Sequence, residues 1–160
     1  MDKFDRQILS LLQLDGRTSW TELAERINLS TSATLRRVQA LQEAGVIQGY
    51  RAMLDADRLG YEVRAFVEVN VDRASTALVE LFRRRIAALP QVISCYMVSG
   101  SVDFVLEVVS PDIKSHADFI ENSILKLRGV KDASSKIVFR TIKAPAPYAV
   151  DSGPSYSIAK

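Results

Sequence analysis

The order of hydrophobic patterns between residues 61 and 143 is the feature that most constrains the fold. Residues 61–71 alternate apolar and polar side chains, as a strand with one buried face does. Helical and alternating stretches then follow in turn, with Pro90 closing the first helix. The expected elements are a strand at 61–71, a helix at 75–89, strands at 92–98 and 104–109, a helix at 112–127 and a strand within 130–142, strongest at Ile137, Val138 and Phe139. This βαββαβ order predicts a ferredoxin-like domain.

An internal repeat supports the same topology. A shift of 38 positions carries Phe82, Ile86, Leu89 and Val92 onto Ile120, Ile124, Leu127 and Val130. The shift also superposes the ends of the two expected helices, so we interpret the domain as two similar βαβ halves.

Three helices are expected before this domain. Apolar residues recur at helical spacing in residues 2–14. Ser19 and Glu22 have the spacing of a capping box, in which each side chain accepts from the backbone N–H of the other residue, so a second helix should follow over 20–27. A third helix should occupy residues 30–44. Two helices joined by a short turn and preceded by a third form a helix-turn-helix unit.

The third of these helices carries two adjacent arginines, Arg36 and Arg37, with no acidic residue three or four positions away. At about 100° per residue, Arg36 points directly away from the expected buried side and Arg37 lies at its edge. Residues 26–51 contain four arginines and one acidic residue. A solvated face is one interpretation. The concentration of charge favours the other, DNA contact, because the second helix of such a pair enters the major groove, where arginine can pair with guanine.

Overall composition excludes several other classes of protein. The 21 Lys and Arg residues against 19 Asp and Glu give a net charge of +2, too small to indicate nucleic acid or an anionic membrane by itself. Cys95 and His116, the single residues of their types, cannot form an internal disulfide or a structural zinc site, and His116 is expected on the surface. No pairing of a nucleophile with a base is visible, so we expect no catalytic residues, metal or cofactor. No apolar run approaches a membrane helix, which predicts a cytoplasmic protein without a membrane partner.

Four segments of the chain resemble the Lrp/AsnC family of transcriptional regulators, also called feast/famine regulatory proteins. The segments read DRQILSLLQLDGR, TELAERINLSTSATLRRVQALQEAGVIQGYRAML, CYMVSGSVDF and LRGVKD. The resemblance covers residues 2–143, and the family has the same order of a helix-turn-helix and a ferredoxin-like domain. It implies dimers paired through the sheets of their α/β domains and assembled further, commonly into octamers. Such dimers bind partly palindromic double-stranded operators. Matched by position, the DNA-binding residues are Ser30, Thr31, Ser32, Ala33, Arg36 and Arg37.

The resemblance also implies a small effector, usually an amino acid, bound between dimers near the turn SGSVD. Backbone N–H groups of such a turn can hold a carboxylate, and Asp103 can accept from an ammonium group. The alternative is a plain hairpin turn in which Asp103 bonds its own backbone. The effector-binding residues matched by position are Ser99, Gly100, Ser101, Val102, Asp103, Ser134, Ser135 and Lys136. A lysine at position 136, where an aromatic or hydroxyl residue is expected, favours an effector with a second acidic group.

The expected fold class is α+β, with a winged-helix-like helix-turn-helix domain followed by the ferredoxin-like domain. We place the DNA-binding domain at 1–50, a linker at 51–60, the effector-binding and oligomerisation domain at 61–143 and a flexible tail at 144–160. The expected function is a sequence-specific regulator of amino-acid-related metabolism that responds to a small metabolite. Two alternatives stay open: a weakly specific architectural DNA-binding protein, and an enzyme resembling siroheme decarboxylase, which would call for histidines near the pocket.

Overall fold

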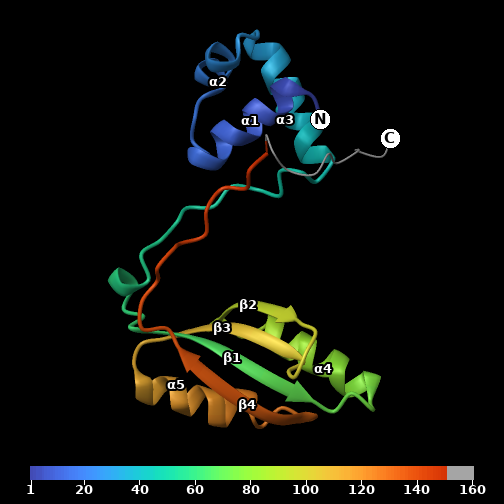
Figure 1. Cartoon of the computed structure of the whole chain (residues 1–160), viewed down its shortest axis with the longest axis vertical. Coiled ribbons are helices and arrows are strands. Elements are labelled where there is room, and N and C mark those ends of the chain that lie inside the picture. Colours follow the sequence, from blue (N-terminus) through green and yellow to red (C-terminus); the bar gives the residue numbers. More distant parts are fainter. Residues whose placement is uncertain (151–160) are drawn as a thin grey trace. The chain divides into compact units, whose positions relative to one another are not determined.

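A computed structural model describes residues 1–150. The chain forms two compact units. The first comprises Met1–Met53 together with the chain from Lys143 onward, and the second comprises Leu54–Ile142. Because the chain passes from the first unit to the second and back again, two connections join them. The helices and strands of both units are labelled in Figure 1.

The first unit contains the three helices expected from the sequence. They are α1 (Lys3–Leu14), α2 (Trp20–Ile27) and α3 (Thr31–Glu43). Each contributes one apolar face to a common core, as the helical spacing of its apolar residues requires. The buried residues of this core are Ile8, Leu9, Leu12, Leu23, Ile27, Val38 and Leu41.

The caps of these helices differ in part from expectation. The Ser19 Oγ accepts from the Glu22 N–H at 3.2 Å, but Glu22 does not return the contact. Its carboxylate instead accepts from Arg26 at 2.6 Å, so the reciprocal capping box predicted there is wrong and the ion pair four residues apart is present. A complete capping box occurs on α1, where Asp2 and Asp5 satisfy each other's backbone N–H.

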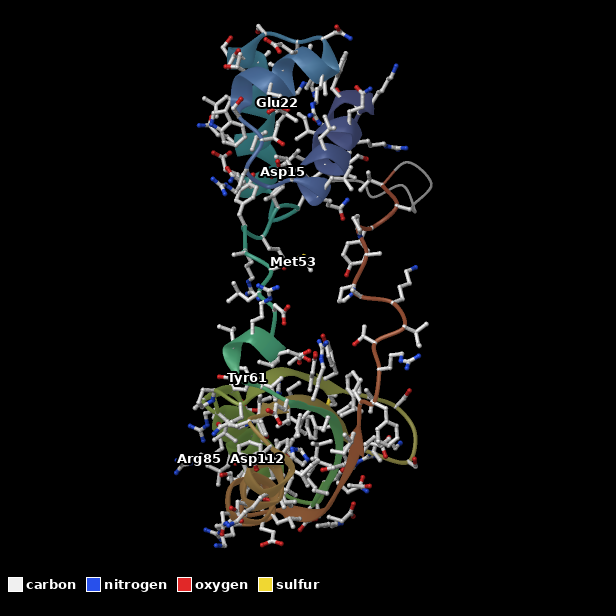
Figure 2. The ribbon with its side chains drawn as sticks, turned by 90° about the vertical axis from the view of Figure 1, so that its left-hand side faces the viewer. Asp15, Glu22, Met53, Tyr61, Arg85 and Asp112 are labelled. Atoms are coloured by element: carbon white, nitrogen blue, oxygen red, sulfur yellow. The ribbon has the colours of Figure 1, made fainter. Side chains whose placement is uncertain are left out.

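The segment after α3 is irregular. Gly45 has a φ of 69°, a left-handed conformation that glycine adopts without steric cost, and it ends the helix. Residues 44–62 contain no strand, so the described part of the chain has a helix-turn-helix without the β-hairpin of a winged helix. Between Met53 and Tyr61, both labelled in Figure 2, the only regular element is the short 3-10 helix η1 (Asp57–Leu59).

The second unit is the predicted ferredoxin-like domain. Its elements are β1 (Val63–Val71), α4 (Thr76–Ala87), β2 (Val92–Met97), β3 (Phe104–Ser110), α5 (Ile113–Phe119), the π-helix η2 (Ile120–Ile124) and β4 (Val130–Ile137). The four strands form one antiparallel sheet in the order β2-β3-β1-β4. The fold class and the strand order that the sequence predicts are therefore confirmed.

The helices of this unit cover one face of the sheet (Figure 1). Phe82 and Ile86 of α4 are buried there, as are Ile120 and Ile124, their counterparts in the internal repeat. The expectation that the last strand is strongest at residues 137–139 is wrong. β4 ends at Ile137, which pairs with Ala65 near the start of β1, and Phe139 beyond it is 98% exposed.

Residues 143–150 return to the first unit. The Tyr148 N–H donates to Gln13 Oε1 at 2.7 Å, and the Gln13 amide donates to the Tyr148 carbonyl at 3.1 Å. Val150 packs against the core of the three helices. The described part of the expected flexible tail is thus held on α1 by backbone contacts, and residues 151–160 lie outside the described residues.

Candidate DNA-binding surface and effector site

The start of α3 is shaped by one cap and one buried face. Ser30 is the N-cap, and its Oγ accepts from the Ala33 N–H at 3.2 Å. Thr34, Val38 and Leu41 form the buried face. The buried face is therefore turned from the expected one, which included Thr31 in place of Thr34. As a consequence, the side chains at the helix start are free to meet a partner.

The expected DNA-binding residues come together on this surface, with one exception. Ser30, Thr31, Ser32 and Arg36 are exposed, and Ala33 is half-buried among them. Arg36 has no ion pair within residues 1–150. A helix N-terminus beside hydroxyl groups and a cation can contact phosphates, and an arginine on the outward face can reach base edges.

Arg37 is the exception. Its guanidinium lies 2.8 Å from both Asp2 and Asp5, at the start of α1, and its Cζ lies 5.4 Å from the centre of the Phe4 ring. The hydrogen bond to Asp5, followed by that to Asp2, raises the pKa of Arg37, and the bond from the Asp5 N–H lowers the pKa of Asp2. The interpretation of both arginines as unpaired is therefore wrong for Arg37. Acidic residues neighbour it in another helix rather than in its own.

The second expected site surrounds the turn of residues 99–103, which connects β2 to β3. Gly100 has a φ of 117°, a conformation that residues with side chains rarely adopt. The amides of Gly100 and Ser101 have no acceptor within residues 1–150. Asp103 ends the turn, and its own backbone bonds to Val69 and Val98 tie the turn to the sheet.

A hollow of about 510 Å³ opens beside this turn. It is lined by Gly100, Ser101 and Asp103 from the expected set, together with residues that the sequence did not indicate. These additional residues are Asn70, Asp72, Arg73, Lys131 and Asp132. The topology could have found them, because β1 ends, and β4 begins, at the edge of the sheet where β3 starts.

Residues 134–136 do not line this hollow. They lie farther along β4, where Ser134 pairs with Glu68 and Lys136 with Phe66. Lys136 makes an ion pair with Glu68 on the face of the sheet that the helices leave open. Ser135 turns to the other face and hydrogen-bonds His116 Nε2 at 2.9 Å. The structure therefore separates these three residues from the turn and from one another.

His116 is buried, contrary to the expected surface position. It lies on α5, with Nδ1 3.4 Å from Ser110 Oγ and Nε2 bonded to Ser135, so it connects α5 with β3 and β4. Loss of solvation lowers the pKa of His116, which favours a neutral ring. This arrangement is a buried polar contact within the core.

Two further classes of site were searched for along residues 1–150. No group of three or more His, Cys, Asp or Glu residues is placed to hold a metal ion in this range. No helix there is long and apolar enough to cross a membrane.

Two family models match the chain. The AsnC-type helix-turn-helix domain matches residues 1–42, and the Lrp/AsnC ligand binding domain matches residues 64–148. The first contains α3, and the second contains the turn at 99–103 with its hollow.

Curated relatives resemble the chain over most of its length. A leucine-responsive regulatory protein of Rhizobium meliloti is 41% identical over 143 residues, which cover 89% of this chain and 92% of the relative. The Bkd operon transcriptional regulator of Pseudomonas aeruginosa is 37% identical, with 89% and 93% covered.

Solved structures agree with these relatives. A transcriptional regulator from Neisseria meningitidis, solved as a complex with L-Met, matches with a TM-score of 0.90 and 32% identity, over 94% of this chain and 97% of that one. An AsnC family transcriptional regulator from Agrobacterium tumefaciens matches with a TM-score of 0.87 and 34% identity, over 94% and 98%. The chain therefore belongs to the Lrp/AsnC family of transcriptional regulators.

Proposed function

We propose that this regulator reads a specific operator with the exposed N-terminal half of α3. The observation that carries the proposal is the unpaired Arg36 on a surface of small side chains, Ser32 and Ala33. Small neighbours allow the helix to approach the floor of the major groove, and the guanidinium supplies a fork that matches guanine.

The two arginines then have different roles. Arg36 contacts a base edge, while Ser30, Thr31 and Ser32 contact phosphates at the helix start. Arg37 acts by holding α3 against α1 through Asp2 and Asp5. It therefore positions the helix and leaves Arg36 to read the DNA.

The experiment that tests this function has two steps. Operators are first selected from random DNA with the purified protein, and genome-wide mapping of bound sites identifies the genes beside them. Binding to a selected operator and to a shuffled duplex is then compared at low and moderate salt. A sequence-specific regulator keeps its preference at moderate salt, whereas a weakly specific architectural protein loses affinity for both duplexes alike.

A dimer through the open face of the sheet is the proposed assembly. Phe66 stands in the middle of this face, between the ion pair of Arg64 with Glu107 and that of Lys136 with Glu68. It is 42% exposed, an unusual position for a large apolar side chain at the centre of a sheet. Pairing two such faces buries Phe66 and brings two copies of α3 to one partly palindromic operator. Octamers built from these dimers complete the proposed assembly.

Light scattering after size exclusion tests the assembly. Wild-type protein should elute as a dimer or a multiple of it, and Phe66→Glu should yield monomers. Ile93→Glu is the control, because Ile93 is exposed at the bulge of the edge strand β2. An unchanged mass for Phe66→Glu would place the interface elsewhere.

The effector in this proposal is an amino acid bound beside the turn at 99–103. The supporting observations are the unoccupied amides of Gly100 and Ser101 and the charged hollow next to them. Asp103→Ala should spare DNA binding and blunt the effector response. The proposal includes Ser99 and Val102, the flanking residues of the turn, but no direct contact from Ser134, Ser135 or Lys136. A role in the cytoplasm completes it.

The enzyme alternative does not hold. The relatives are transcriptional regulators, so this protein is a regulator rather than an enzyme. The one histidine, which a tetrapyrrole enzyme would require near its pocket, is bonded to two serines in the core of the second unit.

A further inference from the structure

Two hollows of different chemistry meet at the ion pair of Arg73 with Asp103. The charged hollow of about 510 Å³ lies on one side. A second hollow of about 280 Å³ lies on the other, and it shares Val71, Arg73 and Asp103 with the first. The remaining wall of the second hollow is apolar, formed by Val79, Met97, Val98 and Phe104. Together they form one site with a charged end and an apolar end.

Asp103 is fully engaged within the protein. Its Oδ2 accepts from the Val71 N–H at 2.9 Å, and its Oδ1 accepts from the Arg73 guanidinium. The side chain is only 8% exposed, and the bond from Arg73, with that from Val71, lowers the pKa of Asp103. An ionised carboxylate with both oxygens occupied has little capacity left for a ligand. Asp103 is therefore a positioning residue that fixes Arg73 at the junction of the two hollows.

Arg73 has capacity that Asp103 lacks. It bonds Asp103 through Nε and Nη2, so the N–H groups of Nη1 remain unused, and 68% of its side chain is exposed. The amides of Gly100 and Ser101 line the same hollow. A guanidinium beside free amides is suited to a carboxylate, which it can hold by charge-assisted hydrogen bonds.

Acceptors for an ammonium group lie across the charged hollow. Asp132 accepts from the Asn70 amide at 3.1 Å, and Asp72 lies 3.9 Å from Lys131. Neither Asp72 nor Asp132 has an arginine partner in the described chain. The charged hollow thus offers both a cation for a carboxylate and carboxylates for an ammonium group, which are the two ends of an α-amino acid.

We infer that the site takes an α-amino acid with an uncharged apolar side chain. Its carboxylate binds Arg73, and its side chain enters the hollow formed by Val79, Met97 and Phe104. The thioether of Met97 adapts to the shape of such a side chain. An acidic side chain is excluded because the apolar hollow provides no partner for its charge, and Lys136 is far along β4 on the opposite face. This inference rests on the proposed amino-acid effector and names its class.

Isothermal titration of the full-length protein tests the inference. The probes are L-methionine, L-leucine, L-glutamate, L-lysine and 3-(methylthio)propylamine, which is methionine without its carboxylate. Wild-type protein should bind L-methionine or L-leucine at least about tenfold more tightly than the two charged amino acids, and the amine should bind weakly. Arg73→Gln should weaken L-methionine binding by about tenfold or more and remove the difference between L-methionine and the amine.

Two more variants complete the design. Arg83→Gln is the matched control, because Arg83 is an equally exposed arginine paired with Glu80 on α4, and it should bind as wild type does. Met97→Lys replaces an exposed wall residue without disturbing the core and should shift the preference toward L-glutamate.

The outcomes separate this inference from the proposed function. Tighter binding of a charged amino acid by wild type, or unchanged L-methionine binding by Arg73→Gln, overturns the inference and leaves an amino-acid effector in place. If none of the four amino acids binds the wild-type protein, the proposed effector and the inference both fail.

Discussion

The start of α3 and the hollow beside residues 99–103 treat charge in opposite ways. On α3, Arg36 is exposed and has no ion pair in the described chain. Beside the turn, the cation Arg73 already has an anion within bonding distance, and Lys131 lies close to another. One region carries an uncompensated charge, and the other carries a balanced set.

This difference corresponds to two kinds of ligand. DNA is a polyanion, so a surface that meets it gains from unpaired cations, and the released counterions make the binding salt-dependent. An amino acid is a zwitterion, so a site for it needs charges of both signs and no net excess. The same contrast occurs within α3, since Arg37 is paired with Asp2 and Asp5 while its neighbour Arg36 is not.

Removing the unpaired charge should give the largest effect. Arg36→Ala is expected to lower affinity for a selected operator by roughly 1–3 kcal/mol, because it removes a bidentate contact with a base. Fluorescence anisotropy with the selected and shuffled duplexes measures it, with Arg83→Ala as the control outside α3. An equal loss on both duplexes would assign Arg36 to a phosphate and weaken the comparison.

The buried side of α3 should respond to the opposite kind of change. Thr34 Oγ1 is buried and has no hydrogen-bond partner among the described residues. Thr34→Val keeps the shape of the side chain and removes the unpaired hydroxyl, so it should stabilise the protein by about 1 kcal/mol. Chemical unfolding measures the change, and Thr34→Ser, which keeps the hydroxyl and loses the methyl, should destabilise. Lower stability for Thr34→Val would show that the hydroxyl has a partner such as a buried water.

A smaller effect is expected from the paired arginine. Arg37→Ala should cost about 0.5–1 kcal/mol of stability, since its ion pairs with Asp2 and Asp5 are partly exposed and screened by solvent. Thermal unfolding at low and high salt measures this, and Arg37→Lys should retain part of the stability. If Arg37→Ala unfolds as wild type does but binds every duplex more weakly, Arg37 is a phosphate contact and the contrast within α3 is wrong.

The smallest effect should be a change in pH dependence. Burial lowers the pKa of His116, so the neutral ring stabilises the folded state above the unfolded pKa of about 6.5. That contribution is lost as the pH falls from this value toward the lower folded pKa. Denaturant midpoints between pH 7 and pH 5 should therefore fall less for His116→Gln than for wild type. Parallel curves would mean that His116 does not titrate differently in the folded protein.

Much of the fold could be predicted because each element buries a single face. The spacing of apolar residues shows such faces directly, as at Phe82 and Ile86 and at their counterparts Ile120 and Ile124. Predictions that depended on partners elsewhere in the chain were less accurate. The end of β4 is set by where β1 begins, and the carboxylate of Glu22 chose Arg26 over its expected cap.

The candidate sites divide in the same way. The exposed start of α3 followed from helical phase, but Arg37 meets its acids on another helix, where a count of neighbours within one helix cannot find them. At the second site, the turn could be located by its glycine and by family resemblance. Arg73 and Lys131 could not, because they reach the hollow only through the pairing of β1 with β3 and β4.

The central claim is that an amino acid at the Arg73 site changes how α3 binds its operator. The most direct measurement is a titration of a selected operator with full-length protein, with and without saturating L-methionine or L-leucine. The account predicts that one of these amino acids changes the operator affinity of wild type, that Arg73→Gln removes this response, and that Arg36→Ala weakens binding under both conditions, since linkage requires the effector to prefer one state of the protein. An operator affinity that is the same with and without the amino acids would contradict it.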